Sequence, residues 1–331
     1  MSPYDLDAAI VNLYYIVFVV FALSANSLLI YLIIYRSPHS LHSFKLLLAN
    51  TAVNQILLAL TGGFLQERML PCDTVLALLP VGPCRYFGPT TCFVAYNIAN
   101  ALNMNIAISV LHSMFFRYRL IRATQMSNAR VRTNLLITAA VPLFLAISPH
   151  VIPFHFNIVM EVAMREHPDY NLEKYGPFGG FYSTTSPLFM VNSAILFGTA
   201  VALPIVIFYW RHHILKALNS SEAVFTEKTR RNSKLLIKAL TVQAVMPLLC
   251  YVPTGLLYFI AQFSGYKFEF LEYLFPILTT LPCAIDPLVT IYFITPYRVW
   301  ELINTVDTIV MESSALEKKL SQCAHDKLAS T

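Results

Sequence analysis

The amino-acid sequence predicts an all-α integral membrane protein that crosses the bilayer seven times. Hydrophobic residues make up 56% of its 331 residues and charged residues only 12%, which is more apolar than the surface of a water-soluble protein tolerates. The apolar residues also gather into seven stretches of about 20 residues, the length that spans roughly 30 Å of hydrocarbon. A bilayer is therefore the natural solvent of this chain.

Each predicted span is a continuous apolar stretch bounded by charged or turn residues. The spans cover residues 10–35, 45–65, 90–116, 134–156, 187–210, 238–263 and 273–295. They do not alternate with period two, so they fit helices and not the strands of a β-barrel. The first span follows Asp5 and Asp7 without any Lys or Arg, unlike a signal peptide, so we expect it to be retained.

Basic residues favour one side of the predicted bundle. When the loops are assigned alternately to the two sides, 18 of the 23 Lys and Arg residues fall on the side of the C-terminus. Because basic loops stay in the cytosol, the C-terminus is predicted to be cytosolic and the N-terminus extracellular. The basic residues are expected to meet membrane lipid, and we expect no nucleic-acid partner, which would need them on one continuous surface.

The connections between spans are short. The longest cover residues 66–89, 157–186 and 211–237, and none is expected to bury a core of its own. Residues 1–295 are therefore predicted to form one seven-helix domain.

Residues 296–331 are predicted to form a cytoplasmic tail. Within it, Val299, Ile303, Val306 and Val310 share one helical face. This stripe favours a short amphipathic helix on the inner leaflet, with an unstructured tail as the alternative.

One carboxylate is predicted to lie deep in the bilayer. Asp286 falls near the middle of the seventh span, where such a side chain costs about 2.5–3.5 kcal/mol on insertion scales. Pro287 follows it directly and predicts a local kink. We interpret the pair as a polar switch with partners among Asn26, Asn50 and Asn54 on the first two spans. The alternative is a purely structural carboxylate.

The third span is rich in asparagine, which must face the bundle because lipid would not accept it. At 3.6 residues per turn, Tyr96, Asn100 and Asn103 share one face in the outer and middle part of the helix. These three residues are expected to line a cavity for a small-molecule ligand, with interhelical hydrogen bonding as the alternative. His112 has no second ligand at a useful spacing, so we expect no metal, and no phosphate-binding glycine motif indicates a cofactor.

Six cysteines divide between the two sides of the membrane. Three of them, Cys72, Cys84 and Cys92, fall at or outside the outer boundary, where conditions are oxidising. One disulfide is predicted among these three, and the sequence alone does not choose the pair.

Three segments resemble a known family of membrane proteins. They are GPCRYFGP at 82–89, FRYR at 116–119 and IDPLVTIYFITPYR at 285–298. Together they are similar to nematode serpentine seven-transmembrane chemoreceptors of the str superfamily. The first segment and RRNSK at 230–234 are most similar to the class delta branch, called Srd. The resemblance extends over essentially the whole chain.

The resemblance implies a G-protein-coupled receptor without enzymatic activity, which detects small environmental molecules in the plasma membrane of sensory cilia. Its partners would be a small-molecule ligand and a heterotrimeric G protein. The expected G-protein face consists of Arg117, Tyr118, Arg119, Arg230, Arg231 and Lys234. For the basic members of this face, anchoring to anionic lipid is the alternative role.

The match to rhodopsin-like receptors is looser. Phe116 replaces the acid that normally precedes Arg117-Tyr118, and residues 157–186 contain no cysteine for the usual disulfide to the third helix. Tyr251 and Pro253 stand where an aromatic-x-Pro toggle is expected, and Tyr292 lies two positions beyond the expected tyrosine. We assign these three residues to the polar switch.

Other classes of function fit the sequence less well. An intramembrane aspartyl protease needs two carboxylates in one site, and only Asp286 is available. A small transporter would show two similar halves, which are absent, and a ligand-gated channel of the insect type would have its N-terminus inside. A transporter or channel is the main alternative to a receptor, followed by a structural or trafficking protein.

Overall fold

A computed structural model of the chain describes residues 3–36, 42–72, 74–121, 127–220, 227–264 and 269–294. Within these residues, seven helical segments are long and apolar enough to cross a membrane, which confirms the predicted bundle. They are Ala9–Tyr35, Phe44–Leu65, Pro89–Leu120, Asn128–His150, Pro187–Asn219, Arg230–Gln262 and Leu271–Phe293. The tail helix expected within residues 296–331 lies outside the described residues.

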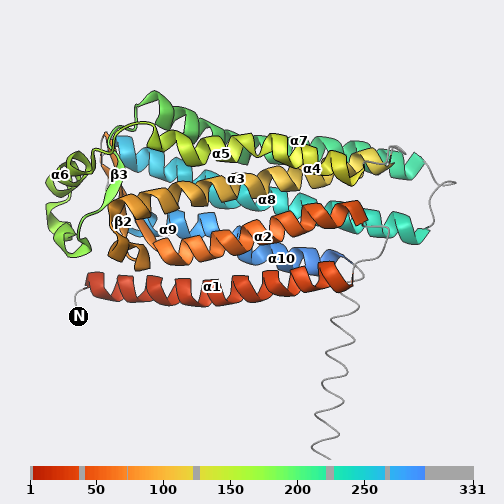
Figure 1. The fold of residues 1–331 in the computed structure, drawn as a ribbon, viewed down its shortest axis with the longest axis horizontal. Coiled ribbons are helices and arrows are strands. Elements are labelled where there is room, and N and C mark those ends of the chain that lie inside the picture. Colours follow the sequence, from red (N-terminus) through yellow and green to blue (C-terminus); the bar gives the residue numbers. More distant parts are fainter. Residues whose placement is uncertain are drawn as a thin grey trace, which may run out of the picture.

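Five of the spans are single helices that lie along the long axis of the molecule (Figure 1). They are α1 (Pro3–Tyr35), α2 (His42–Leu65), α3 (Pro89–Ile121), α7 (Pro187–Ser220) and α8 (Glu227–Ser264). Helices α7 and α8 run beyond the predicted spans 187–210 and 238–263, because polar residues extend both helices at one end. Figure 1 shows α1 along one edge, where it packs on α2 and α10.

The other two spans are interrupted at or close to a proline. The fourth consists of α4 (Asn128–Thr138), α5 (Ala140–Ile147) and the 3-10 helix η3 (Ser148–His150). The seventh consists of α9 (Glu269–Thr280) and α10 (Pro282–Phe293). The seventh span is interrupted at Leu281, because Pro282 has no N–H to continue the helix, and the kink expected at Pro287 stays a prediction. Pro287 lies inside α10.

The loops at one end of the bundle form a cap (Figure 1). Its sheet has the antiparallel order β1 (Glu67–Cys72), β2 (Val75–Pro80) and β3 (Gly179–Phe181), and α6 (Phe156–Glu166) packs against it. Their shared core consists of Leu70, Cys72, Val75, Ala77, Leu79, Val159, Ala163, Tyr170, Leu172, Tyr175 and Phe178.

The loops at 66–89 and 157–186 are each expected to bury no core of their own, and in the structure the two together bury a shared core. Neither loop could bury one alone, but β2 pairs with β1 on one side and with β3 on the other. Each loop supplies part of a common core, so two short segments achieve what one cannot.

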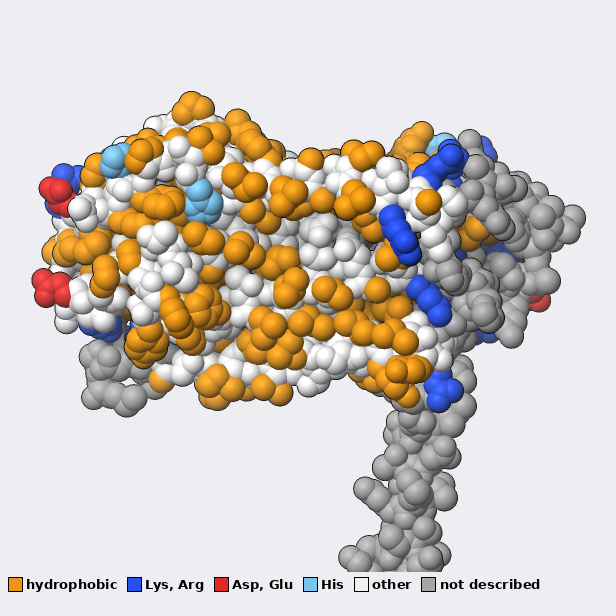
Figure 2. Space-filling model, in the orientation of Figure 1, with side chains coloured by type: hydrophobic (Ala, Val, Ile, Leu, Met, Phe, Trp, Pro, Cys, Tyr) orange, Lys and Arg blue, Asp and Glu red, His pale blue; other side chains and the backbone are white. Residues whose placement is uncertain are grey.

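The surface matches a protein that lies in a bilayer. Figure 2 shows hydrophobic side chains along the middle of the bundle and a group of Lys and Arg side chains near the end opposite the cap, here called the basic end. Large apolar residues such as Leu136 (76% exposed), Ile205 (65%) and Leu249 (63%) point away from the bundle. So much exposed apolar surface is stable only against lipid or another protein.

Candidate functional site

One cavity of the described structure lies inside the bundle and has a volume of about 130 Å³. Its walls come mainly from α3, α7, α8, α9 and α10, and Met69 and Leu76 of the cap close one end. Tyr96, Asn100 and Asn103, the residues expected to line a ligand cavity, all belong to its wall. Because the remaining wall is largely Leu, Ile, Val, Met and Phe, an occupant would meet few polar atoms.

The polar atoms of this wall are held in place by contacts between helices. The Tyr251 hydroxyl lies 3.1 Å from Oδ1 of Asn103 and 2.9 Å from the backbone carbonyl of Thr279. It has a single proton to share between these two acceptors. Tyr251 thereby joins α8 to α3 and α9 beside the cavity.

Asp286 lies at the deep end of the same cavity and is only 2% exposed. Gln55 of α2 donates a hydrogen bond of 2.9 Å to its Oδ2. Gln243 of α8 donates to the Thr290 hydroxyl at 3.0 Å and lies 3.4 Å from the Asp286 backbone carbonyl. Among the described residues, Oδ1 of Asp286 has no hydrogen-bond partner. One carboxylate oxygen thus remains available beside the cavity.

The asparagines predicted as partners of Asp286 have other contacts, so this prediction is corrected. Asn26 donates to the Cys283 carbonyl at 3.0 Å and joins α1 to α10. Asn50 and Asn54 of α2 contact the side of α3 that faces away from the predicted ligand-lining residues. Asn50 donates to Ser109 at 2.6 Å, and Asn54 accepts from Asn105 at 2.9 Å. These bonds join α2 to α3 and stabilise the bundle.

Two other residues assigned to the polar switch lie away from Asp286. Tyr292 is 60% exposed on α10, and Pro253 is exposed on α8. The proline of α8 that reaches the cavity is Pro247, about 1.7 turns earlier along the same helix. Pro287, in contrast, is buried next to Asp286.

A buried ion pair connects the cap to α9. Arg68 of β1 donates from Nε to Glu272 at 2.6 Å, and both side chains are at most 2% exposed. The rings of Tyr170 and Tyr273 also contact the guanidinium, each with its centroid 4.8 Å from Cζ. Burial lowers the pKa of Arg68, but Glu272, Tyr273 and Tyr175 together outweigh burial and raise that pKa above its ordinary value. Glu272 also corrects the expectation that Asp286 is the one acid within the spans.

Glu67 precedes this arginine and has a different environment. Its Oε2 is buried and has no hydrogen-bond partner among the described residues. Burial raises the pKa of this carboxyl to about 8, because the ionised form loses its hydration without gaining a cation.

At the basic end, Arg117 is buried against an aromatic ring. It is 6% exposed, and its Cζ lies 4.4 Å from the ring centroid of Phe44 on α2. Phe116, which replaces the usual acid, stacks on the same Phe44 ring at 6.0 Å. Nε and Nη2 of Arg117 have no hydrogen-bond partner among the described residues. The guanidinium is therefore held by a cation–π contact in place of an ion pair.

The other residues of the expected G-protein face are less buried than Arg117. Tyr118 and Arg119 are half-buried, Arg230 donates to Asn219 at 3.1 Å, and Arg231 is exposed. Lys234 lines a groove of about 320 Å³ between α7 and α8, together with Arg211, Leu215, Asn219, Ile237 and Lys238.

The comparison with known protein families identifies this arrangement. The profile described as "Serpentine type 7TM GPCR chemoreceptor Srd" matches residues 11–302, which include the spans except for the first two residues of the first span. The chain belongs to the Srd family of chemoreceptors. It is thus a receptor of the G-protein-coupled type with a chemosensory role, as the resemblance of its motifs implied.

Individual relatives agree with the family profile. The chain is 30% identical over 279 residues to serpentine receptor class delta-59 of Caenorhabditis elegans, covering 84% of this chain and 86% of the relative. It is 32% identical over 243 residues to serpentine receptor class delta-63 of the same organism, covering 72% and 75%. Squid rhodopsin has the same fold, with a TM-score of 0.61 over 91% of this chain and 87% of its own, at 16% identity.

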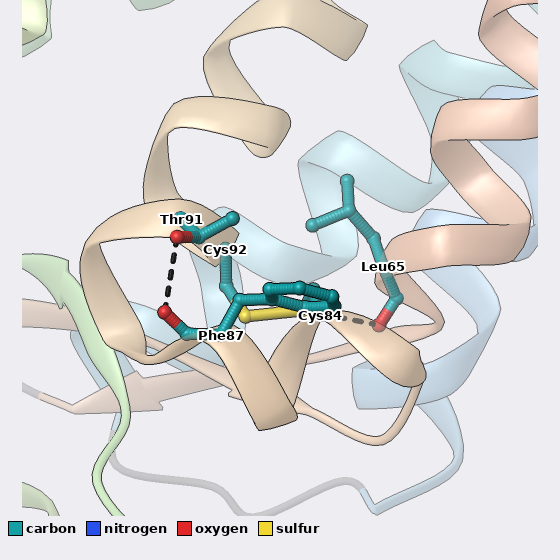
Figure 3. The surroundings of a disulfide bond; sticks show 5 residues. All are labelled: Leu65, Cys84, Phe87, Thr91 and Cys92. Carbon is teal, nitrogen blue, oxygen red and sulfur yellow. Dashed lines mark hydrogen bonds between the residues drawn. A yellow bond between two sulfur atoms is a disulfide. The ribbon is translucent and has the colours of Figure 1, made fainter.

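In this Srd chain, a disulfide between Cys84 and Cys92 closes the turn that enters α3 (Figure 3). Cys84 lies in the 3-10 helix η2 (Pro83–Phe87), and its Sγ faces the Leu65 carbonyl at the end of α2. Gly82 lies so close to α2 that a Cβ atom there would come within 2.7 Å of Leu65 O. Gly88 has a φ of +91°, which favours glycine. The resembling segment 82–89 is thus a tight connection between α2 and α3.

No sequence motif points to several residues of this Srd site. Gln55, Gln243 and Arg68 belong to no motif, and Glu272 falls just before the predicted seventh span. Polarity alone indicates the two glutamines, because Gln55 and Gln243 each lie inside an apolar span, where an unpaired amide is costly.

Proposed function

We propose that this Srd receptor binds a small, mostly apolar molecule in the cavity beside Asp286 and transmits its presence to a heterotrimeric G protein at the basic end. The observation that carries the proposal is the cavity itself. It extends from the cap residues Met69 and Leu76 to Asp286, so one occupant would contact both the cap and the deep polar cluster. Family membership supports the chemosensory role.

The size and lining of the cavity support this class of ligand. A volume of about 130 Å³ is close to the roughly 150 Å³ of an engineered apolar cavity that admits benzene. Asn100, Asn103 and Tyr251 provide the few groups that would orient a polar substituent. A larger or charged molecule would have to displace side chains or lose its hydration.

The proposed orientation has the cap outside and the basic end in the cytosol. The basic residues of α3, α4, α7 and α8 support it, because positively charged segments resist translocation. The proposed location is the plasma membrane, in cilia of sensory neurons, and the proposed activity is signalling without enzymatic turnover.

A cavity-filling pair of variants tests the ligand site. Ala200 of α7 is buried in the cavity wall, whereas the adjacent Val201 is 45% exposed on the outside. In cells with a G-protein readout and an agonist found by screening, Ala200→Leu is expected to lower agonist potency at least tenfold at normal surface level. Val201→Leu should respond like wild type.

A second pair tests the polar contact. Tyr251→Phe removes the hydroxyl beside Asn103, and the loss of about 0.5–1.5 kcal/mol should lower potency roughly two- to tenfold. Tyr86→Phe makes the same change at a side chain that is 75% exposed and serves as the control. Full potency in both Ala200→Leu and Tyr251→Phe would show that the ligand binds elsewhere.

A further inference from the structure

Three potential metal ligands meet in the cap, away from the cavity. They are Cys72, the last residue of β1, and the neighbours Glu166 and His167 at the end of α6. One ligand atom from each residue lies within 4.8 Å of the other two. The two segments belong to different loops of the chain, so only the folded cap brings these donors together.

We propose that Cys72, Glu166 and His167 bind a zinc ion that ties α6 to β1. Zinc accepts thiolate, imidazole and carboxylate ligands together in a tetrahedral site, and three protein ligands leave one position for water. The thiolate disfavours magnesium and calcium, which prefer oxygen ligands. Ligand atoms on one zinc are about 3.5 Å apart, so side-chain adjustments on the order of 1 Å would complete the site.

The surroundings of His167 fit a metal ligand. Its Nε2 lies 3.2 Å from the carbonyl of Pro71, an acceptor for the Nε2 proton. A metal-bound histidine usually donates its second ring N–H in this way, which leaves Nδ1 with the lone pair for the metal. The ring also packs on Tyr170, with 4.8 Å between centroids, so its orientation is fixed.

The contacts around the cluster hold its backbone in place, and the end of α6 favours a cation. Gln262 of α8 donates to the carbonyls of Cys72 and Val75, each at 3.2 Å, and so holds the end of the hairpin that bears the thiol. Glu166 and His167 lie at the C-terminus of α6, where the helix dipole favours positive charge. Cys72 and His167 are at most 4% exposed, whereas Glu166 is half-buried and gives access from solvent.

The position of the site gives the ion a structural role. The β1–β2 hairpin that bears Cys72 also contributes Met69 and Leu76 to the cavity wall. A zinc ion between this hairpin and α6 would therefore stabilise the closed end of the cavity. The metal site itself depends neither on the identity of the ligand nor on the G protein.

Cobalt binding to the purified full-length receptor tests the proposal directly. The receptor is purified without a polyhistidine tag, treated with a chelator and titrated with Co²⁺, which reports a thiolate ligand through a charge-transfer band in the near ultraviolet. We expect one Co²⁺ per chain, displaced by Zn²⁺ and not by Mg²⁺. Zn²⁺ should also raise the melting temperature of the metal-free receptor.

Variants assign the ligands. Cys72→Ser should abolish the band, and Glu166→Gln and His167→Gln should each weaken Co²⁺ binding at least tenfold. Two controls should bind like wild type: Cys250→Ser, a cysteine within α8, and Glu161→Gln, an exposed carboxylate on the same α6. If Cys72→Ser does not fold, Co²⁺ binding by Glu166→Gln still tests the site, because Glu166 is only half-buried. A wild-type receptor without the band, or unchanged binding in Glu166→Gln, would overturn the site.

Discussion

Asp286 has one satisfied and one unsatisfied oxygen at the deep end of the cavity. Oδ2 accepts from Gln55, whereas Oδ1 has no partner among the described residues. A ligand shifts a conformational equilibrium only through contacts that differ between the two states. A donor on the ligand, or a rearranged Gln243, would provide such a difference at Oδ1. We therefore propose that Asp286 and its two glutamine neighbours form the polar switch.

The Asp286 variants separate a switch from a structural carboxylate. Asp286→Asn keeps an acceptor for Gln55 and should reach the cell surface at normal level while altering agonist-driven signalling. Asp286→Leu leaves the Gln55 amide without its acceptor and should lower stability by about 1–3 kcal/mol. Surface staining, signalling and the melting temperature of purified receptor measure these effects. Wild-type signalling in both variants would reduce Asp286 to a structural role.

Arg117 is expected to act through the shape of its guanidinium. A lysine at this position keeps the charge but cannot lie flat on the Phe44 ring. Arg117→Lys should therefore lower agonist-driven signalling roughly two- to fivefold, as expected for about 0.5–1 kcal/mol of cation–π energy. Arg231→Lys is the control, because Arg231 is exposed and a lysine at this position would attract anionic lipid equally well. Equal, full responses of both variants would assign these arginines to membrane orientation.

Glu67 makes receptor stability depend on pH. Its carboxyl has an ordinary pKa of 4.5, and burial raises this pKa to about 8 in the folded protein. Between these two values the folded state binds a proton that the unfolded state has lost, so stability falls as pH rises through this window and levels off above it. Melting temperatures across this window should decline in wild type.

Substitution isolates the contribution of Glu67 to this decline. Glu67→Gln cannot ionise, so its melting temperature should decline less steeply over the same window. Glu161→Gln changes an exposed carboxylate of α6 and should keep the wild-type slope. The same slope in Glu67→Gln and wild type would contradict the assignment.

Among the secondary-structure elements, helices could be predicted and strands could not. A spanning helix needs only a long apolar stretch, which is visible in the sequence without any tertiary contact. Strand β2 (Val75–Pro80) is buried at every position, so it lacks the alternation that marks a half-exposed strand. Its pairing with β3, about 100 residues later, depends on contacts between two loops that no local pattern reports.

The polar contacts of the bundle were predicted in part. The face of α3 that bears Tyr96, Asn100 and Asn103 follows from helix periodicity, and all three line the cavity. The hydrogen-bond partner of Asp286 cannot be predicted in this way, because the sequence does not reveal how each helix is rotated about its own axis. Gln55 is one position beyond Asn54 on α2, and that single step of about 100° decides which of them meets α10.

The connection between α2 and α3 depends on its disulfide. Closing a loop between Cys84 and Cys92, eight residues apart, should contribute about 2–3 kcal/mol by the chain-entropy model. Peptide mapping under non-reducing conditions should find the Cys84–Cys92 pair. Cys84→Ser, Cys92→Ser and the double variant should lose similar stability, because each removes the same bond. A linked peptide that contains Cys72 would refute this pairing.

Considered as a whole, the molecule has two different ends. The cap end is built from β1–β3 and α6, and the basic end bears the arginines and lysines of α3, α7 and α8. This asymmetry is visible in Figure 2, and from it we predict one preferred orientation in a membrane.

The orientation can be read from tags at the two termini. An epitope at the N-terminus should be stained on intact cells, and one at the C-terminus only after permeabilisation, because the basic segments remain in the cytosol. A chain tagged at both ends with different epitopes controls for leaky membranes within the same cell. The reverse staining would contradict both the orientation and the proposed site of G-protein contact.

The ion pair between Arg68 and Glu272 also constrains how the chain matures. The two residues are 204 positions apart, so during synthesis the cap must wait for the last span before its arginine finds a carboxylate. A chain truncated before α9 lacks Glu272 and Tyr273, so its guanidinium would have no carboxylate partner, at a cost on the order of several kcal/mol if it were buried. We expect such a chain to leave the cap incompletely folded and to be retained in the endoplasmic reticulum.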